Sequence, residues 1–188
     1  MPNDIRQILE ASKTILHGHF LLTSGLHSPI YLEKFRIFQF PHYTQRLCGM
    51  IADHYRQMEV EVVAGPALGG IILAYEVARQ LRSRCIFAER VGDEREFRRG
   101  LSIATGEKVL VVDDILSTGG SVLEVLEAVK KAKGEVVGAG VLIDRTAGKI
   151  ELGAPLYSCY QLEVPAYRSE ECPQCAAGEP LVRPGSKL

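Results

Sequence analysis

The chain has 188 residues, of which 46% are hydrophobic and 24% charged, as expected for one globular domain with a sizeable core. The formal net charge of −1 argues against a protein that binds nucleic acid or a membrane surface through a basic excess. No run of eighteen apolar residues is present, and the N-terminus lacks the pattern of a secretory signal, so we expect no membrane span and a cytoplasmic location.

The N-terminal segment predicts a helix, an extended region and a second helix. Apolar residues near helical spacing indicate a helix over 4–16, with Asn3 or Asp4 as its cap. Two extended apolar pieces follow around a Ser-Gly and a Ser-Pro, which is typical of a hairpin or a looped hood. Pro41 is expected to begin a helix that runs to about Met58.

The middle of the chain alternates predicted strands and helices, and this alternation predicts a parallel sheet with right-handed crossovers. Gly134 is expected to end the last of these helices. Between two of the strands, residues 90–100 are charged and predict an exposed, mobile loop. The predicted strands are 60–64, 84–88, 108–112, 136–143 and 156–162, and the predicted helices are 71–81 and 121–133.

A string of acids, hydroxyls and glycines, DDILSTGGS, connects a predicted buried strand to a predicted helix. Ligands of open parallel sheets bind at the carboxyl ends of the strands, and amides at a helix start bind phosphate. The string is neither a Walker A motif nor GxGxxG. The predicted phosphate-binding residues are Ser117, Thr118, Gly119, Gly120 and Ser121.

The presence of two adjacent carboxylates, Asp113 and Asp114, beside a predicted phosphate site requires a separate explanation, because negative charges repel phosphate. Binding of a ribose diol and Mg²⁺ would explain the two acids. Carboxylates accept hydrogen bonds from hydroxyl groups, and Mg²⁺ binds oxygen ligands from carboxylates and phosphates together. The alternative is an acidic pair that only caps the next helix.

Two further features could contact phosphate groups. In GPALGG, residues Ala67, Leu68, Gly69 and Gly70 could form an anion-binding nest, although a glycine turn used only for packing would look the same. The charged loop could close over a diphosphate and neutralise it, or it could be an ordinary solvated loop. Its basic residues are Arg90, Arg95, Arg98 and Arg99, and its acids are Asp93, Glu94 and Glu96.

The segment from Val109 to Ser121 resembles the phosphoribosyl diphosphate (PRPP) signature of type I phosphoribosyltransferases. FLLTSGLHSPIYLE and GPALGG resemble the N-terminal segment and the diphosphate loop of orotate phosphoribosyltransferases. The sequence LIDR, ending at Arg145, resembles the segment whose arginine binds the orotate carboxylate. These similarities run in the family's order across residues 18–146.

This resemblance implies a Rossmann-like, mostly parallel sheet flanked by helices, with a small hood from the N- and C-terminal segments. The single domain would comprise a hood over about 1–40 and part of the C-terminal region, a core over about 41–163 and an irregular tail over about 168–188. It also implies a homodimer, the substrates PRPP and orotate, and Mg²⁺. The products would be orotidine 5′-phosphate and diphosphate, as in UMP biosynthesis.

The resemblance also implies residue roles. Asp113 and Asp114 would hold the ribose hydroxyls and Mg²⁺, the metal mostly through substrate and water. Residues 117–121 would bind the 5′-phosphate and residues 67–70 the diphosphate. Tyr31 and Leu32 would frame the base, and Arg145 would pair with the orotate carboxylate, unless it only pairs with Asp144.

The chain departs from the family at several cations, which indicates a divergent branch. Thr23 and Leu68-Gly69 stand where lysines are usual, and Glu89-Arg90 replaces an Arg-Lys pair. Arg90, Arg95, Arg98 and Arg99 could replace these cations at the diphosphate, and Arg90 and Arg95 are the ones predicted to be catalytic. Two alternatives remain open: a type I transferase for a purine base, and a PRPP-sensing regulator without catalysis.

The five cysteines fall into two groups. Cys48, Cys85 and Cys159 lie in apolar surroundings and are expected to be reduced core residues. Cys172 and Cys175 form a Cys-x-x-Cys that resembles half of a zinc knuckle, whereas a closed zinc site needs four ligands. We expect an irregular, reduced tail, with zinc as the alternative if histidines fold near it. A redox role is disfavoured because the motif is not predicted to begin a helix directly after a strand.

Overall fold

The computed structural model describes residues 4–22, 24–146 and 148–184. The chain forms two compact units, one comprising Met1–Gln39 with Glu163–Leu188 and the other Phe40–Leu162. We describe each unit separately. None of the helices in the described ranges is long and apolar enough to cross a membrane.

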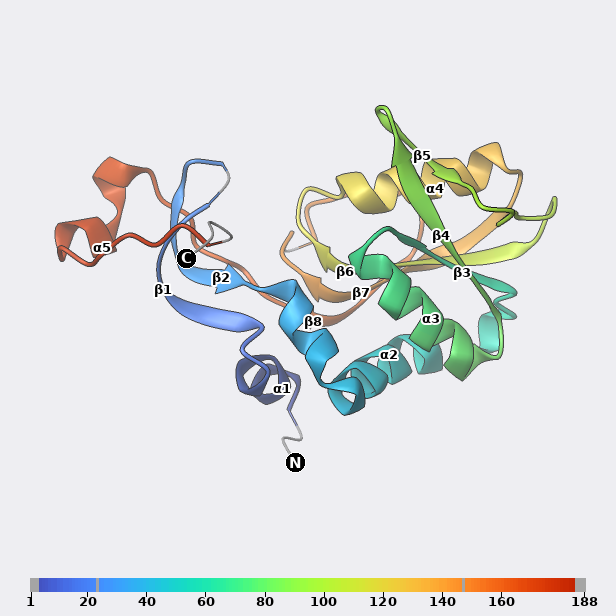
Figure 1. The fold of residues 1–188 in the computed structure, drawn as a ribbon, viewed down its shortest axis with the longest axis horizontal. Coiled ribbons are helices and arrows are strands. Elements are labelled where there is room, and N and C mark those ends of the chain that lie inside the picture. The colour runs from blue at the N-terminus through green and yellow to red at the C-terminus, as the bar shows by residue number, and fades with distance from the viewer. Residues whose placement is uncertain (1–3, 23, 147, 185–188) are drawn as a thin grey trace. The chain divides into compact units, whose positions relative to one another are not determined.

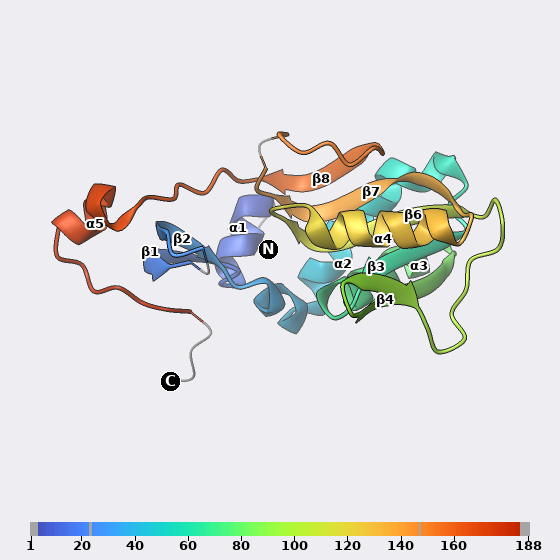
Figure 2. The ribbon, with the colours of Figure 1, turned by 90° about the horizontal axis from the view of Figure 1, so that it is seen from above.

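The larger unit is built on a six-stranded sheet in the order β5-β4-β3-β6-β7-β8, and in this order Figure 2 labels the strands from β4 to β8. All neighbouring pairs are parallel except β4 and β5, which are antiparallel. This confirms the predicted Rossmann-like α/β fold. The strands are β3 (Val62–Pro66), β4 (Arg84–Val91), β5 (Glu94–Phe97), β6 (Lys108–Leu116), β7 (Glu135–Asp144) and β8 (Leu156–Gln161).

Helices cover both faces of this sheet. Helix α4 (Gly120–Lys131) packs its apolar side, including Val125 and Val129, on alternate residues of β3, β6 and β7. Helices α2 (Pro41–Tyr55) and α3 (Gly69–Leu81) lie on the opposite side (Figure 1). The predicted helix from Pro41 to about Met58 is confirmed, because a 3-10 turn over Arg56–Met58 continues α2.

Helix α2 packs closely against β7 because the two residues of β7 that face this helix are glycines. A Cβ atom on Gly138 would lie 2.6 Å from the Tyr55 ring, and one on Gly140 would lie 2.5 Å from Ile51 Cγ2. The Tyr55 hydroxyl passes over the strand and donates to the carbonyl oxygens of Ala139 (2.9 Å) and Pro155 (3.3 Å). The glycines therefore let a buried tyrosine hydrogen-bond to the sheet.

Gly138→Ala should destabilise the fold by about 1–3 kcal/mol, because the added methyl overlaps a buried ring that is also fixed by hydrogen bonds. Urea unfolding followed by circular dichroism measures the change. Gly49→Ala in the middle of α2 is the matched control, since its nearest foreign atom is the end of the flexible Gln80 side chain at 3.1 Å. Equal losses in the two variants would show that the close packing at Gly138 is unimportant.

Three details of the larger unit differ from prediction. Residues 90–100 contain an antiparallel hairpin rather than a loop, because Arg95 and Phe97 point inward while their neighbours are exposed. Strand β6 extends to Leu116 and includes the acid pair. Helix α4 ends in a Schellman motif whose left-handed residue is Lys133, with Gly134 N–H bonding to Val129 O.

In the smaller unit, the first helix is shorter than predicted. Helix α1 (Ile5–Ala11) is capped by Asp4, whose side chain accepts from Arg6 N–H, while Asn3 lies outside the described residues. The helix ends because Ser12 folds back on Leu9 O and Lys13 adopts a positive φ of 55°. The following apolar residues therefore belong to a strand.

The predicted hairpin is confirmed as an antiparallel pair, β1 (Ile15–Leu21) and β2 (His27–Leu32), and a 3-10 helix over Lys34–Gln39 follows it. The C-terminal tail is less irregular than predicted, with a 3-10 turn (Ser169–Glu171) and α5 (Pro173–Ala176) (Figure 1). Cys172 is the N-cap of α5, so the Cys-x-x-Cys begins a helical turn, but a 3-10 turn rather than a strand precedes it. Backbone bonds tie Tyr167 to His27 and Val182 to both His19 and Leu21.

Candidate active site

The acid pair occupies the carboxyl end of β6. Asp113 lies opposite Val141 of β7. The Asp113 residue is 5% exposed and the Asp114 residue 2%. Each carboxylate accepts from the next backbone amide: Asp113 Oδ1 from Asp114 N–H at 2.8 Å, and Asp114 Oδ1 from Ile115 N–H at 2.7 Å. The strand and these bonds fix the two carboxylates in place, so they are not an exposed helix cap.

The loop after β6 has the form of a phosphate cradle. Gly119 is the N-cap of α4 with φ of 80°, a conformation that glycine adopts without strain. The first amides of α4 have no partner within the helix and therefore suit an anion. A small pocket opens here, lined by Asp113, Ile115, Leu116, Ser117, Thr118, Gly119, Gly120, Ser121 and Val122. The structure thus brings together the residues predicted to bind the 5′-phosphate.

The GPALGG turn connects β3 to α3 in a tightly folded form. A Cβ atom on Gly65 would lie 2.4 Å from Gly70 O, and one on Gly70 would lie 2.5 Å from Pro66 Cδ. Ala67 N–H bonds to Ala88 O of β4, and the Leu68 side chain is 74% exposed at the tip. Packing alone therefore explains two of the glycines, whereas the exposed tip is available to a ligand.

These two loops follow adjacent strands at the point where the strand order reverses. From β3 the chain passes through α3 to β4 on one side, and from β6 it passes through α4 to β7 on the other. Such a switch point separates the two loops at the carboxyl edge and is where ligands bind in open α/β sheets. The acid pair at the end of β6 lies at the same edge.

Glutamates hold the arginines of the β4–β5 hairpin. Arg90 Nη2 and Arg95 Nε both bond to Glu124 of α4, at 2.6 and 2.9 Å, and Arg99 Nη2 bonds to Glu89 at 2.9 Å. Arg99 lowers the pKa of Glu89 through this contact. Arg98 is exposed. Because Glu124 lies far from both arginines in sequence, no local pattern identified it.

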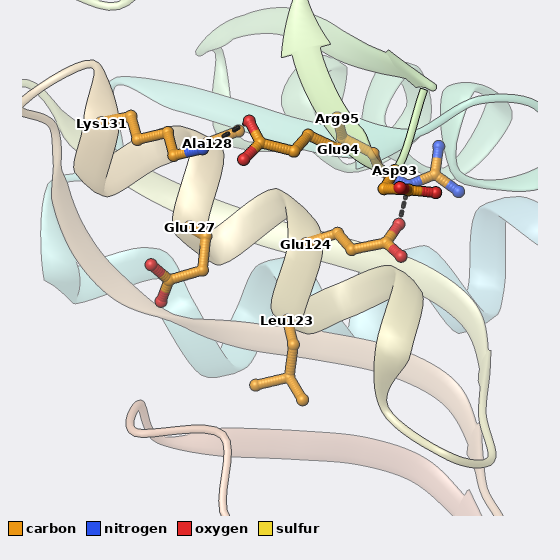
Figure 3. A pocket seen from close by; sticks show the side chains of 8 residues that line it. All are labelled: Asp93, Glu94, Arg95, Leu123, Glu124, Glu127, Ala128 and Lys131. Carbon is orange, nitrogen blue, oxygen red and sulfur yellow. Dashed lines mark hydrogen bonds and ion pairs between the residues drawn. The ribbon is translucent and has the colours of Figure 1, made fainter. Parts of the chain in front are cut away.

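A pocket between the hairpin and α4 is drawn in Figure 3. Arg95 points from β5 toward Glu124, and Lys131 of α4 forms an ion pair with Glu94 of β5. Arg95 also donates to the carbonyl oxygens of Ala67 and Ala88, at 3.3 Å each. This side chain therefore connects the hairpin to the GPALGG turn.

Arg145 follows β7 and is fixed by its backbone, whose N–H bonds to Leu116 O at 2.9 Å. Burial lowers the pKa of its guanidinium. Across 4–22, 24–146 and 148–184, no residue bonds to its buried Nε atom. Its neighbour Asp144 instead accepts from Thr146 N and Oγ1, both at 2.7 Å. An ion pair with Asp144 is therefore not the role of Arg145.

The predicted base-framing residues belong to the other unit. Tyr31 and Leu32 end β2, and the Tyr31 ring lies 5.7 Å from the Phe20 ring between centroids. Burial is the main cause of the raised pKa of Tyr31. Their contact with a base stays a prediction. Thr23, at one of the missing cation positions, lies outside the described residues.

Comparison with known proteins gives a consistent result. The Phosphoribosyl transferase domain family matches residues 36–171. The chain is 49% identical to the orotate phosphoribosyltransferase of Caldanaerobacter subterraneus over 97% of the chain and 96% of that protein. It is 44% identical to the orotate phosphoribosyltransferase of Thermotoga maritima over 97% of this chain and 98% of that protein.

Solved structures agree with these relatives. The orotate phosphoribosyltransferase of Aeropyrum pernix superposes with a TM-score of 0.75 at 25% identity, covering 85% of this chain and 94% of that one. The Mycobacterium tuberculosis orotate phosphoribosyltransferase in complex with inorganic phosphate gives 0.69 at 26%, covering 86% and 97%. An adenine phosphoribosyltransferase from Rhodothermus marinus, at 21% identity and 0.66, shares the fold and covers 84% and 99%.

Proposed function

The chain belongs to the phosphoribosyltransferase family, and from this premise we propose that it transfers the 5-phosphoribosyl group of PRPP to orotate. The products are orotidine 5′-phosphate and diphosphate. The observation that carries this function is the arrangement at the switch point, where a fixed acid pair lies at the same sheet edge as two phosphate-type loops. One loop suits the 5′-phosphate and the other the diphosphate of the same donor.

The donor is held by the two loops and the acid pair. Ser117, Thr118, Gly119, Gly120 and Ser121 bind the 5′-phosphate through amides and hydroxyls, and Ala67, Leu68, Gly69 and Gly70 face the diphosphate. Asp113 and Asp114 accept hydrogen bonds from the ribose hydroxyls. The ring nitrogen of orotate attacks the anomeric carbon as the bond to diphosphate breaks and its electron pair leaves with the diphosphate.

Because that ring nitrogen is acidic, the protein needs no strong base. Its contribution is to position the reactants and to stabilise the charge that develops on the leaving group. Arg90 and Arg95 are our candidates for this stabilisation; Glu124 holds both of them, and Arg95 also contacts the GPALGG turn. The half-buried Arg145, which no carboxylate neutralises in the described ranges, pairs with the orotate carboxylate.

The acid pair also fits Mg²⁺, which prefers carboxylate and phosphate oxygens. Asp113 and Asp114 would hold the ion mostly through substrate and water, and the ion would neutralise charge on the diphosphate. We further propose a cytoplasmic homodimer without nucleic-acid partners. The sequence resemblance supports the dimer, and the net charge of −1 supports the absence of nucleic acid.

The test measures the release of diphosphate from PRPP in the presence of Mg²⁺, with one base added at a time. Orotate should support turnover, with orotidine 5′-phosphate as the product by chromatography, whereas adenine and hypoxanthine should not. Turnover with a purine alone would reassign the acceptor. PRPP binding by calorimetry without diphosphate release for any base would indicate a non-catalytic regulator.

A further inference from the structure

Four potential metal ligands from three parts of the sequence converge in the smaller unit. His19 and His27 lie on the facing strands β1 and β2, Cys172 is the N-cap of α5, and Cys175 lies within that helix. One ligand atom of each residue lies within 4.8 Å of all the others. All four residues belong to the same compact unit, so this geometry is internal to it.

The separations between these atoms match the edges of a tetrahedral metal site. His19 Nε2 lies 3.0 Å from His27 Nδ1, and the sulfur–nitrogen distances are 3.5, 3.6 and 3.2 Å. A tetrahedral zinc ion with ordinary bond lengths requires about 3.3 Å between nitrogens and about 3.6 Å between nitrogen and sulfur. These four separations are close to the required values, and the two remaining pairs of ligand atoms also lie within 4.8 Å of each other.

Hydrogen bonds between the four side chains alone do not explain the cluster. His19 Nε2 is close to three different atoms, and His27 Nδ1 is close to two. The Nδ1 atom of His19 lies 2.9 Å from Glu179 O and, because a carbonyl oxygen only accepts, Nδ1 is the donor of this pair while Nε2 faces the cluster. One cation at the centre satisfies all four atoms together, and the Glu179 carbonyl orients the ligand as outer-shell partners do.

We propose that His19, His27, Cys172 and Cys175 bind a structural zinc ion. Two sulfurs and two imidazole nitrogens in a tetrahedral arrangement select zinc over Mg²⁺ or Ca²⁺, which prefer oxygen. Four protein ligands leave no open position, so the site is structural rather than catalytic. His19, His27 and Cys172 are 3%, 6% and 3% exposed, whereas Cys175 is more exposed and lies at the edge of the site.

The zinc ion would attach the C-terminal tail to the hairpin. The backbone contacts of Tyr167 and Val182, with the bond from Ser28 Oγ to Pro165 O, bring the tail alongside β1 and β2. Such a small unit has little apolar core, and units of this kind are commonly stabilised by a metal. The proposal is independent of the transfer reaction, because it concerns a different group of residues.

The direct test is the metal content of the full-length protein purified without added metal, measured by mass spectrometry of the elements. We expect about one zinc ion per chain in the wild type, as a closed four-ligand site holds a single ion, and less than about a tenth of that in Cys175→Ser. Cys85→Ser, which changes a half-buried cysteine in the larger unit, is the matched control and should retain the full content.

Two further measurements use the wild-type protein, so they test the proposal even if Cys175→Ser fails to fold. After removal of zinc and addition of Co²⁺, thiolate-to-cobalt charge transfer and the visible bands of tetrahedral Co²⁺ should appear. A thiol-blocking mercurial should release zinc in proportion to the cysteines modified. Absence of metal both as purified and after reconstitution of the reduced protein with Zn²⁺ would overturn the proposal.

Discussion

Replacing both acids of the switch point, Asp113→Asn with Asp114→Asn, should reduce kcat/KM for PRPP by about 10³-fold or more, because charge stabilisation in a preorganised site is usually the largest single contribution to catalysis. Asparagine keeps the volume and can still accept hydrogen bonds, so the fold should survive. The amides cannot supply the negative charge that holds Mg²⁺ and the ribose hydroxyls of the donor.

Steady-state rates of diphosphate release measure this effect, with circular dichroism and thermal unfolding as checks on the fold. Asp53→Asn on the exposed surface of α2 is the control, since its ion pair with Arg56 is largely solvated. Near-normal turnover in the double variant would refute the assignment of the acids to the donor. The KM for Mg²⁺ should rise in each single variant.

Arg145→Ala should raise the KM for orotate by about 10- to 100-fold, because removing one partner of a charge-assisted pair leaves the orotate carboxylate uncompensated. The KM for PRPP should change much less, since the loops that hold PRPP stay intact. Arg145→Lys should recover part of the loss, because an ammonium retains the charge but not the two parallel hydrogen bonds of a guanidinium.

Initial rates at varied orotate and varied PRPP separate the two Michaelis constants. Arg79→Ala, which removes an exposed guanidinium paired to Glu76, controls for a general loss of positive charge. A larger rise in the PRPP constant than in the orotate constant would mean that Arg145 contacts the donor. Binding of orotate by calorimetry in the presence of a PRPP analogue gives an independent measure.

The sequence alone determined the fold class and predicted where the donor would bind. Continuous apolar runs predicted the buried strands, and glycine-rich strings after two of them predicted the phosphate loops, because these signals are local. It also identified Arg145 as a candidate. Local signals failed where non-local pairing decided the structure: residues 94–97 became β5 because they align with β4.

Tertiary structure alone decided which partners each functional side chain has. Glu124 holds Arg90 and Arg95, although it lies on another element. Arg145 and Asp144 are adjacent in sequence, yet Asp144 bonds to Thr146. Backbone direction, rather than sequence distance, determines which side chains meet.

The metal cluster shows the same division between sequence and structure. The spacing of Cys172 and Cys175 indicated two ligands of the proposed zinc site, and the sequence contains five histidines without indicating which of them would complete it. The bulge between His17 and Phe20 and the pairing of Leu21 with His27 place His19 and His27 together, and the returning tail adds the cysteines. A ligand set drawn from distant segments is defined only by the folded chain, because no local pattern encodes their approach.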